Sequence, residues 1–78
     1  MAPEKRERLA RLLSAAELGF KDAASALREA DALLRQEAQP VAGVDRGNLQ
    51  SFAAVAEANG AGIENMEARL RQAGERRP

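Results

Sequence analysis

Apolar side chains recur in a seven-residue pattern from Leu9 to Leu34. Large side chains hold one position of this repeat: Leu13, Phe20, Leu27 and Leu34. The other position is mostly alanine: Leu9, Ala16, Ala23 and Ala30. This alternating spacing of four and three residues keeps one stripe of a long helix facing a partner helix. The pattern therefore predicts a long helix that packs along its length against another helix.

The first predicted helix spans about residues 3–37. Pro3 suits its first turn, where the missing N–H has no helical partner in any case, and the next proline is Pro40. An acidic residue four positions before a basic one adds roughly 0.2–0.5 kcal/mol per exposed pair. Four pairs have this order: Glu4–Arg8, Glu7–Arg11, Glu17–Lys21 and Asp31–Arg35.

A turn is predicted at residues 38–47, which contain Pro40 and two glycines but no apolar pattern. Asp45 or Asn48 is suited to cap the next helix, because each offers a side-chain oxygen to unpaired backbone N–H groups. Gly74 favours the end of that helix, so residues 74–78 are predicted to be a frayed tail.

The second predicted helix spans about residues 48–73. One position of its repeat holds Leu49, Ala56, Ile63 and Leu70. The other holds Phe52, Asn59, Met66 and Ala73. Asn59 is the one polar residue in this stripe, and it is interpreted either as a device that fixes register or as the mark of a local break.

The segment Asn59–Gly62 allows two interpretations. Asn-Gly is a turn signal and two glycines weaken a helix, so a break here would give three helices. The apolar repeat nevertheless keeps its phase across the segment, which favours a continuous helix. Gly60 and Gly62 would then allow another backbone to approach closely.

A short turn makes the two helices antiparallel neighbours. Folding the chain about Gly43 aligns both repeats in one set of facing pairs: Leu34–Phe52, Ala30–Ala56, Leu27–Asn59, Ala23–Ile63, Phe20–Met66, Ala16–Leu70 and Leu13–Ala73. We therefore predict an all-α fold, a single-domain antiparallel two-helix hairpin with a coiled-coil-like, alanine-rich seam.

Several leucines and a valine have no place in this seam. Leu9 overhangs the second helix, Leu12, Leu33 and Val55 lie beside the seam, and Leu18 lies on the outer face. With 18 alanines among 78 residues, a lone hairpin has a thin core. We therefore predict that two hairpins pair into a four-helix bundle, or that another helical protein covers these side chains.

The chemistry of the chain argues against catalysis. Cysteine and histidine are absent, which removes thiol chemistry, imidazole acid–base catalysis and the usual zinc ligands. No glycine-rich phosphate loop or metal-ligand spacing occurs. We expect no enzyme activity, cofactor, metal or small-molecule substrate. No membrane span or secretion signal is recognised, so the expected location is cytoplasmic.

Basic residues gather at the end of the hairpin where the two termini meet. Five arginines are candidates for contact with an anion: Arg6, Arg8, Arg11, Arg69 and Arg71. Together with Lys5, Arg76 and Arg77 they outnumber the acidic residues there by four. This end could bind nucleic acid, although it has no aromatic side chain to stack on bases. A solvated set of ion pairs is the favoured interpretation.

The predicted outline, two helices joined through a turn that contains Pro40, is similar to two families of small helical hairpins. One comprises the co-chaperones that hold needle subunits in type III secretion, and the other the plasmid-encoded hairpins that dimerise and bind paired RNA loops. The similarity is one of architecture and implies no site residue. The leading hypothesis is a non-enzymatic helical interaction module, such as a small adaptor, co-chaperone or assembly subunit. A nucleic-acid-binding bundle is the alternative.

Overall fold

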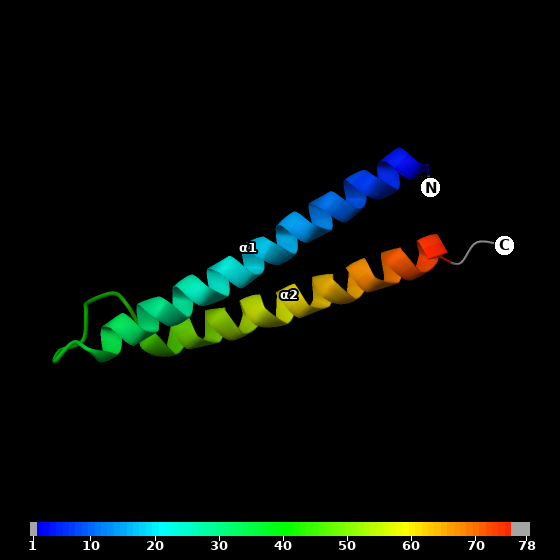
Figure 1. The fold of residues 1–78 in the computed structure, drawn as a ribbon. Coiled ribbons are helices and arrows are strands. Elements are labelled where there is room, and N and C mark those ends of the chain that lie inside the picture. Colours follow the sequence, from blue (N-terminus) through cyan, green and yellow to red (C-terminus); the bar gives the residue numbers. More distant parts are fainter. Residues whose placement is uncertain (1, 76–78) are drawn as a thin grey trace.

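The computed structural model describes residues 2–75 and consists of two helices, α1 (Pro3–Arg35) and α2 (Arg46–Glu75). The helices run antiparallel and contact one another along a rod of 63 × 17 × 16 Å (Figure 1). Their ribbons lie close together near the turn and draw apart toward the two termini. The predicted all-α hairpin is confirmed, whereas its pairing with a second hairpin stays a prediction.

Helix α1 begins at Pro3 and ends at Arg35. Pro3 occupies the first turn, as the missing N–H predicts. The helix closes with two tighter backbone bonds, from the N–H of Gln36 to the carbonyl of Leu33 and from Glu37 to Leu34. It therefore ends two residues before the predicted boundary at residue 37.

The turn ends at Asp45, which caps α2. Its Oδ1 accepts backbone hydrogen bonds from Gly47 at 2.7 Å and from Asn48 at 3.3 Å. These bonds satisfy N–H groups that have no helical partner. Of the two predicted cap residues, Asp45 and not Asn48 therefore caps α2. Within the turn, Gly43 has φ +82°, a conformation that favours glycine.

Helix α2 runs without interruption through Asn59–Gly62. The continuous-helix interpretation is thus confirmed, and no break separates a third helix within the described residues. The predicted stop at Gly74 is wrong, because α2 continues to Glu75. The remainder of the predicted frayed tail, residues 76–78, lies outside the described residues.

The seam between the helices differs from the predicted one by a rotation of each helix. On α1 the positions that face α2 are Leu13, Glu17, Phe20, Ala24, Leu27, Asp31 and Leu34. On α2 they are Leu49, Ala53, Ala56, Gly60, Ile63, Glu67 and Leu70. One stripe of each helix was therefore predicted correctly, but the second stripe lies one residue further along the chain. Successive residues are about 100° apart around a helix, so moving one of the two stripes by one residue turns the middle of the seam by about 50°.

Six of the seven predicted facing pairs are wrong, because one member of each is exposed. The exposed members are Phe52, Asn59, Ala23, Met66, Ala16 and Ala73. Gly60, rather than Met66, lies against Phe20. Only the pair of Ala30 and Ala56 has neither member exposed.

Small residues at the contact between α1 and α2 explain the observed rotation of the helices. Among the described residues, the buried apolar ones are Ala24, Ala53 and Ala56. A Cβ added to Gly60 would lie 3.6 Å from Cβ of Phe20 and 4.0 Å from the carbonyl oxygen of Glu17. Alanine and glycine at the contact allow the helix backbones to approach closely, whereas Phe52 and Met66 in the same place would hold them apart.

Candidate interaction surface

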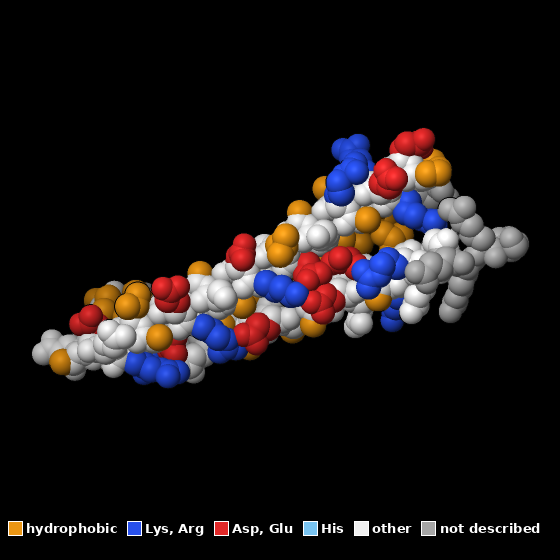
Figure 2. Space-filling model, in the orientation of Figure 1, with side chains coloured by type: hydrophobic (Ala, Val, Ile, Leu, Met, Phe, Trp, Pro, Cys, Tyr) orange, Lys and Arg blue, Asp and Glu red, His pale blue; other side chains and the backbone are white. Residues whose placement is uncertain are grey.

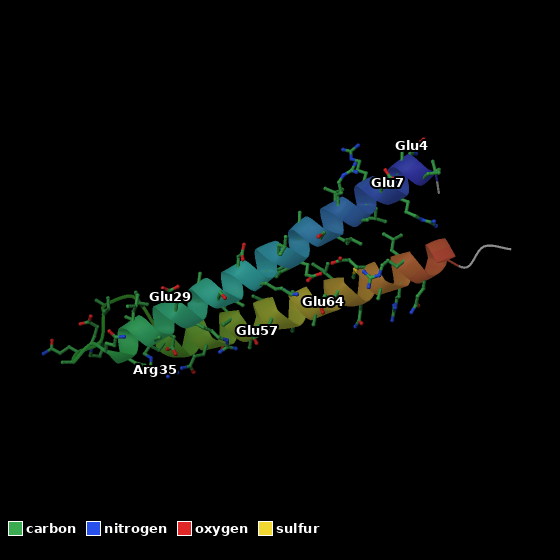
Figure 3. All side chains as sticks on the ribbon, viewed as in Figure 1. Glu4, Glu7, Glu29, Arg35, Glu57 and Glu64 are labelled. Carbon is green, nitrogen blue, oxygen red and sulfur yellow. The ribbon has the colours of Figure 1, made fainter. Side chains whose placement is uncertain are left out.

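Charged side chains bridge the helices along one side of the hairpin, here called the polar flank. Lys21 pairs with Glu64 and Arg28 pairs with Glu57, each at 2.5 Å. Lys21 also contacts Glu17 at 2.6 Å. Figure 2 shows acidic and basic side chains together along the line where the helices meet, and Figure 3 places Glu57 and Glu64 on α2. Both cross-helix pairs fix which sides of α1 and α2 lie together.

The opposite side of the hairpin is almost entirely apolar and is here called the apolar flank. In an antiparallel pair, the positions on the far side of both seam stripes from the ion pairs lie on one common side. On α1 they are Leu9, Leu12, Ala16, Gly19, Ala23, Ala26, Ala30 and Leu33. On α2 they are Phe52, Val55, Asn59, Gly62, Met66, Arg69 and Ala73. Arg69 is the only charged residue in this described set.

Five large side chains of the apolar flank are more than half exposed: Leu12, Leu33, Phe52, Val55 and Met66. Three of them, Leu12, Leu33 and Val55, belong to the predicted interaction residues. Leu9 is half-buried, and Leu18 is exposed on the other side of α1. Sequence reasoning assigned Phe52 and Met66 to the seam and therefore missed them as surface residues.

The three residues singled out in the segment 59–62 have different environments. Gly60 is buried against α1. A Cβ added to Gly62 would meet no atom within 4 Å. Asn59 is exposed on the apolar flank. Gly60, and not Gly62, is therefore the glycine that allows α1 and α2 to approach closely. Asn59 has no role in the seam between α1 and α2.

Asp31 forms the main polar contact near the turn. Its side chain is 6% exposed and accepts a hydrogen bond from Nε of Arg46 at 2.7 Å. Arg35 contacts its other oxygen at 3.0 Å, and Gln50 donates to both at 3.4 Å. The hydrogen bond from Arg46 lowers the pKa of Asp31 despite the cost of burial. Only the pairing of Asp31 with Arg35 was visible in the sequence.

Two glutamates meet in the seam where the helices begin to draw apart. The side chain of Glu17 is 15% exposed, and Oε1 of Glu67 is buried without a hydrogen-bond partner among the described side chains. The neighbouring carboxyl group of Glu17 raises the pKa of Glu67, and burial raises it further. The interaction with Glu67, together with the ion pair to Lys21, lowers the pKa of Glu17. Because two carboxylates side by side repel one another, Glu67 keeps its proton to a higher pH than an isolated glutamate does.

Among the described residues, the arginines of the predicted basic end lie on different sides of the hairpin. Arg6 is half-buried, and its guanidinium would lie 3.0 Å from a Cβ added to Gly74. Arg69 belongs to the apolar flank, and Arg71 follows the stripe that contains Glu57 and Glu64. Arg8 and Arg11 are exposed on α1. Arg76 and Arg77 lie outside the described residues.

Two hollows mark the ends of the rod. One of about 340 Å³ lies between the separating helices and is lined by apolar surface of Ala10, Leu70 and Gly74. The other, of about 760 Å³, lies beside the turn. The described residues hold no group of three acidic side chains placed for a metal ion. No helix in this part of the chain has the length and apolarity to cross a membrane.

Comparisons with protein-family models, curated proteins and solved structures find no match. The surface is therefore interpreted from its own residues.

Proposed function

We propose that the protein is a helical protein–protein interaction module, a small adaptor or assembly subunit that binds through its apolar flank. One observation supports the proposal: five large apolar side chains lie on the same side of the hairpin and are 56–60% exposed. Single exposed leucines are common on protein surfaces, but a continuous apolar side on a thin hairpin is typical of an interface.

Packing within the hairpin leaves much apolar surface to be covered. Its buried apolar residues are three alanines, and none of the described large side chains is fully buried. Covering one half-exposed leucine, phenylalanine or methionine contributes about 1 kcal/mol. Association through the apolar flank would therefore add stability that the isolated hairpin lacks. Two hairpins joined by these flanks would form a four-helix bundle.

Site-specific photo-crosslinking tests the proposal. A photoreactive phenylalanine analogue replaces Val55 on the apolar flank or, as a control, Ala58, which is exposed on the outer side of the same helix. The full chain is then irradiated in an extract of its own cells. Val55 is expected to give a discrete crosslinked product, either with the protein itself or with another protein, and Ala58 is not.

Absence of a product at Val55, or equal products from the two positions, would contradict the proposal. A repeat with the analogue at Leu33 extends the test to α1, because Leu33 lies on the same flank. Circular dichroism checks that each variant retains its helix content.

A further inference from the structure

We infer that the apolar flank binds a second copy of the chain, with the two hairpins face to face and antiparallel and a twofold axis beside Asn59. The inference rests on the proposed function of this flank and adds the partner and its orientation. Four features of the flank carry it: the order of large and small side chains, the place of Asn59, the charge at each end, and the area.

The apolar flank has large side chains toward both ends of the rod and small ones between them, so the order of sizes is the same from either end. Leu33, Phe52 and Val55 form a large cluster toward the turn, and Leu12 and Met66 form another toward the termini. Between the clusters the flank carries only small residues and one amide: Ala16, Gly19, Ala23, Ala26, Asn59 and Gly62. When two copies lie antiparallel, the cluster near the turn of one copy faces the cluster near the termini of the other. The small residues between the clusters then allow the two copies to approach closely at the middle.

Asn59 lies at the centre of this pattern. It is seven residues from both Phe52 and Met66. Across the hairpin, the contact of Gly60 with Phe20 and the pairing of Glu57 with Arg28 set Asn59 level with about residue 23 of α1, midway between Leu12 and Leu33. A twofold axis at this point therefore brings the two Asn59 amides together.

Two facing Asn59 side chains can form hydrogen bonds with one another, because each amide carries a carbonyl acceptor and an NH₂ donor. In the parallel arrangement, with both turns at one end, Asn59 would instead face the alanine-rich stripe of the other α1 and lose its hydrogen bonds with water. A polar group buried without a partner costs free energy. The amide thus favours the antiparallel arrangement.

The charge at the two ends of the rod also favours reversal. At the terminal end, residues 2–11 and 67–74 contain six basic and three acidic residues. The turn end that lies opposite in the antiparallel arrangement, residues 34–51, contains two basic and two acidic residues. Antiparallel copies therefore keep the two positive ends apart and place each beside a neutral turn end, whereas parallel copies place the two positive ends together.

The area of the flank is large enough for a specific dimer. Leu12 to Leu33 spans about 32 Å of helix at 1.5 Å per residue. With the 17 Å width of the rod, each copy contributes a footprint of about 500 Å². The two copies together reach the roughly 1,000 Å² at which specific interfaces begin.

Oxidative crosslinking of single-cysteine variants tests the axis, because the chain contains no cysteine of its own. Asn59→Cys is expected to form a disulfide-linked dimer rapidly under mild copper-catalysed oxidation. Ala58→Cys, its neighbour on the outer side of α2, is the matched control and is expected to crosslink at least tenfold more slowly. Equal rates for the two variants would overturn the inference.

Mixed pairs of variants test the orientation. Leu12→Cys mixed with Leu33→Cys is expected to give a heterodimeric disulfide, because reversal brings these positions together. Leu12→Cys mixed with Met66→Cys is expected to give little, since those positions meet only in the parallel arrangement. The opposite result would exclude the antiparallel dimer.

Light scattering on the unmodified chain separates this inference from the proposed function. A dimer mass at micromolar concentration is expected. A monomer whose Val55 analogue still crosslinks to a different protein would overturn the second copy as partner and leave the interaction module intact. A monomer that gives no crosslinked product at Val55 would contradict both the dimer and the proposed interaction module.

Discussion

Asp31 on α1 and Arg46 on α2 are joined by a 2.7 Å hydrogen bond across the turn. Arg46 is the first residue of α2 and follows its cap Asp45, so the bond ties the start of one helix to the last turns of the other. Asp31 is the only buried charged residue among those that the structure describes, with 4% of its surface exposed. The contact therefore fixes how the turn end of the hairpin closes.

Replacing Asp31 with alanine is expected to lower the melting temperature clearly. The change leaves the Arg46 guanidinium and the Gln50 amide without their acceptor in a partly buried site. Asp22→Ala is the matched control, because Asp22 is exposed on the same helix and such changes stay within about 0.5 kcal/mol. Thermal unfolding followed by circular dichroism measures both. Equal melting temperatures would show that the buried contact does not stabilise the fold.

The same contact predicts a dependence of stability on acid. The hydrogen bond from Arg46 holds the pKa of Asp31 below its ordinary value of 3.8. A lowered pKa in the folded state means that the stabilisation is present above pH 3.8 and is lost as the pH falls through the folded-state value. The stability difference between the natural chain and Asp31→Asn should therefore shrink in strong acid. A difference that is constant from pH 7 to pH 2 would contradict this linkage.

Glu67 is expected to act in the opposite direction. Because its pKa is raised by Glu17 and by burial, the folded state favours the protonated acid, and that stabilisation is lost as the pH rises through the folded-state pKa. Glu67→Gln imitates the protonated form and should raise the melting temperature at pH 7, with a smaller gain in acid. Glu29→Gln, at an exposed position of α1, controls for the change in net charge. A lower melting temperature for Glu67→Gln at neutral pH would count against the raised pKa of Glu67.

The sequence predicts the hairpin well because two signals are strong: a seven-residue apolar repeat on each side of a single turn, and its unbroken phase across Asn59–Gly62. It predicts the rotation of the helices poorly. Ala23 and Ala24 are equally apolar, so composition cannot show which one faces α2. The structure buries Ala24, which lies between Lys21 and Arg28, the α1 members of the two cross-helix ion pairs. The larger stripe with Phe52 and Met66 is consequently left outside.

The apolar flank became visible only once that rotation was known. Phe52 and Met66 have the spacing of core residues, and a pattern of apolar spacing does not distinguish a stripe that faces the other helix of the hairpin from one that faces a second molecule. The half-buried Glu17 and Glu67 were missed for the same reason, since each is one residue away from an apolar position. A stripe that is apolar and yet exposed indicates a further partner.

Gly60 provides a test of the observed rotation. Gly60→Leu is expected to destabilise the hairpin by about 1–3 kcal/mol, because a large side chain would push α2 away from Phe20 and the backbone of Glu17. Ala61→Leu, exposed at the next position, should change the free energy of unfolding by less than about 0.5 kcal/mol. Chemical denaturation measures both variants. Equal effects would indicate that Gly60 does not lie between the helices.

The two phenylalanines provide a final comparison between the hairpin and its dimer. Phe20 lies in the seam against Gly60, whereas Phe52 is 58% exposed on the apolar flank. Phe20→Ala should therefore lower the free energy of unfolding at every protein concentration, by up to about 3 kcal/mol. Phe52→Ala should have a small effect in dilute protein and a growing effect as the concentration rises and the flank is covered by a second copy. Denaturation at several concentrations measures this. A concentration-independent loss of several kcal/mol for Phe52→Ala would place Phe52 in the seam and remove the rotation on which the apolar flank depends.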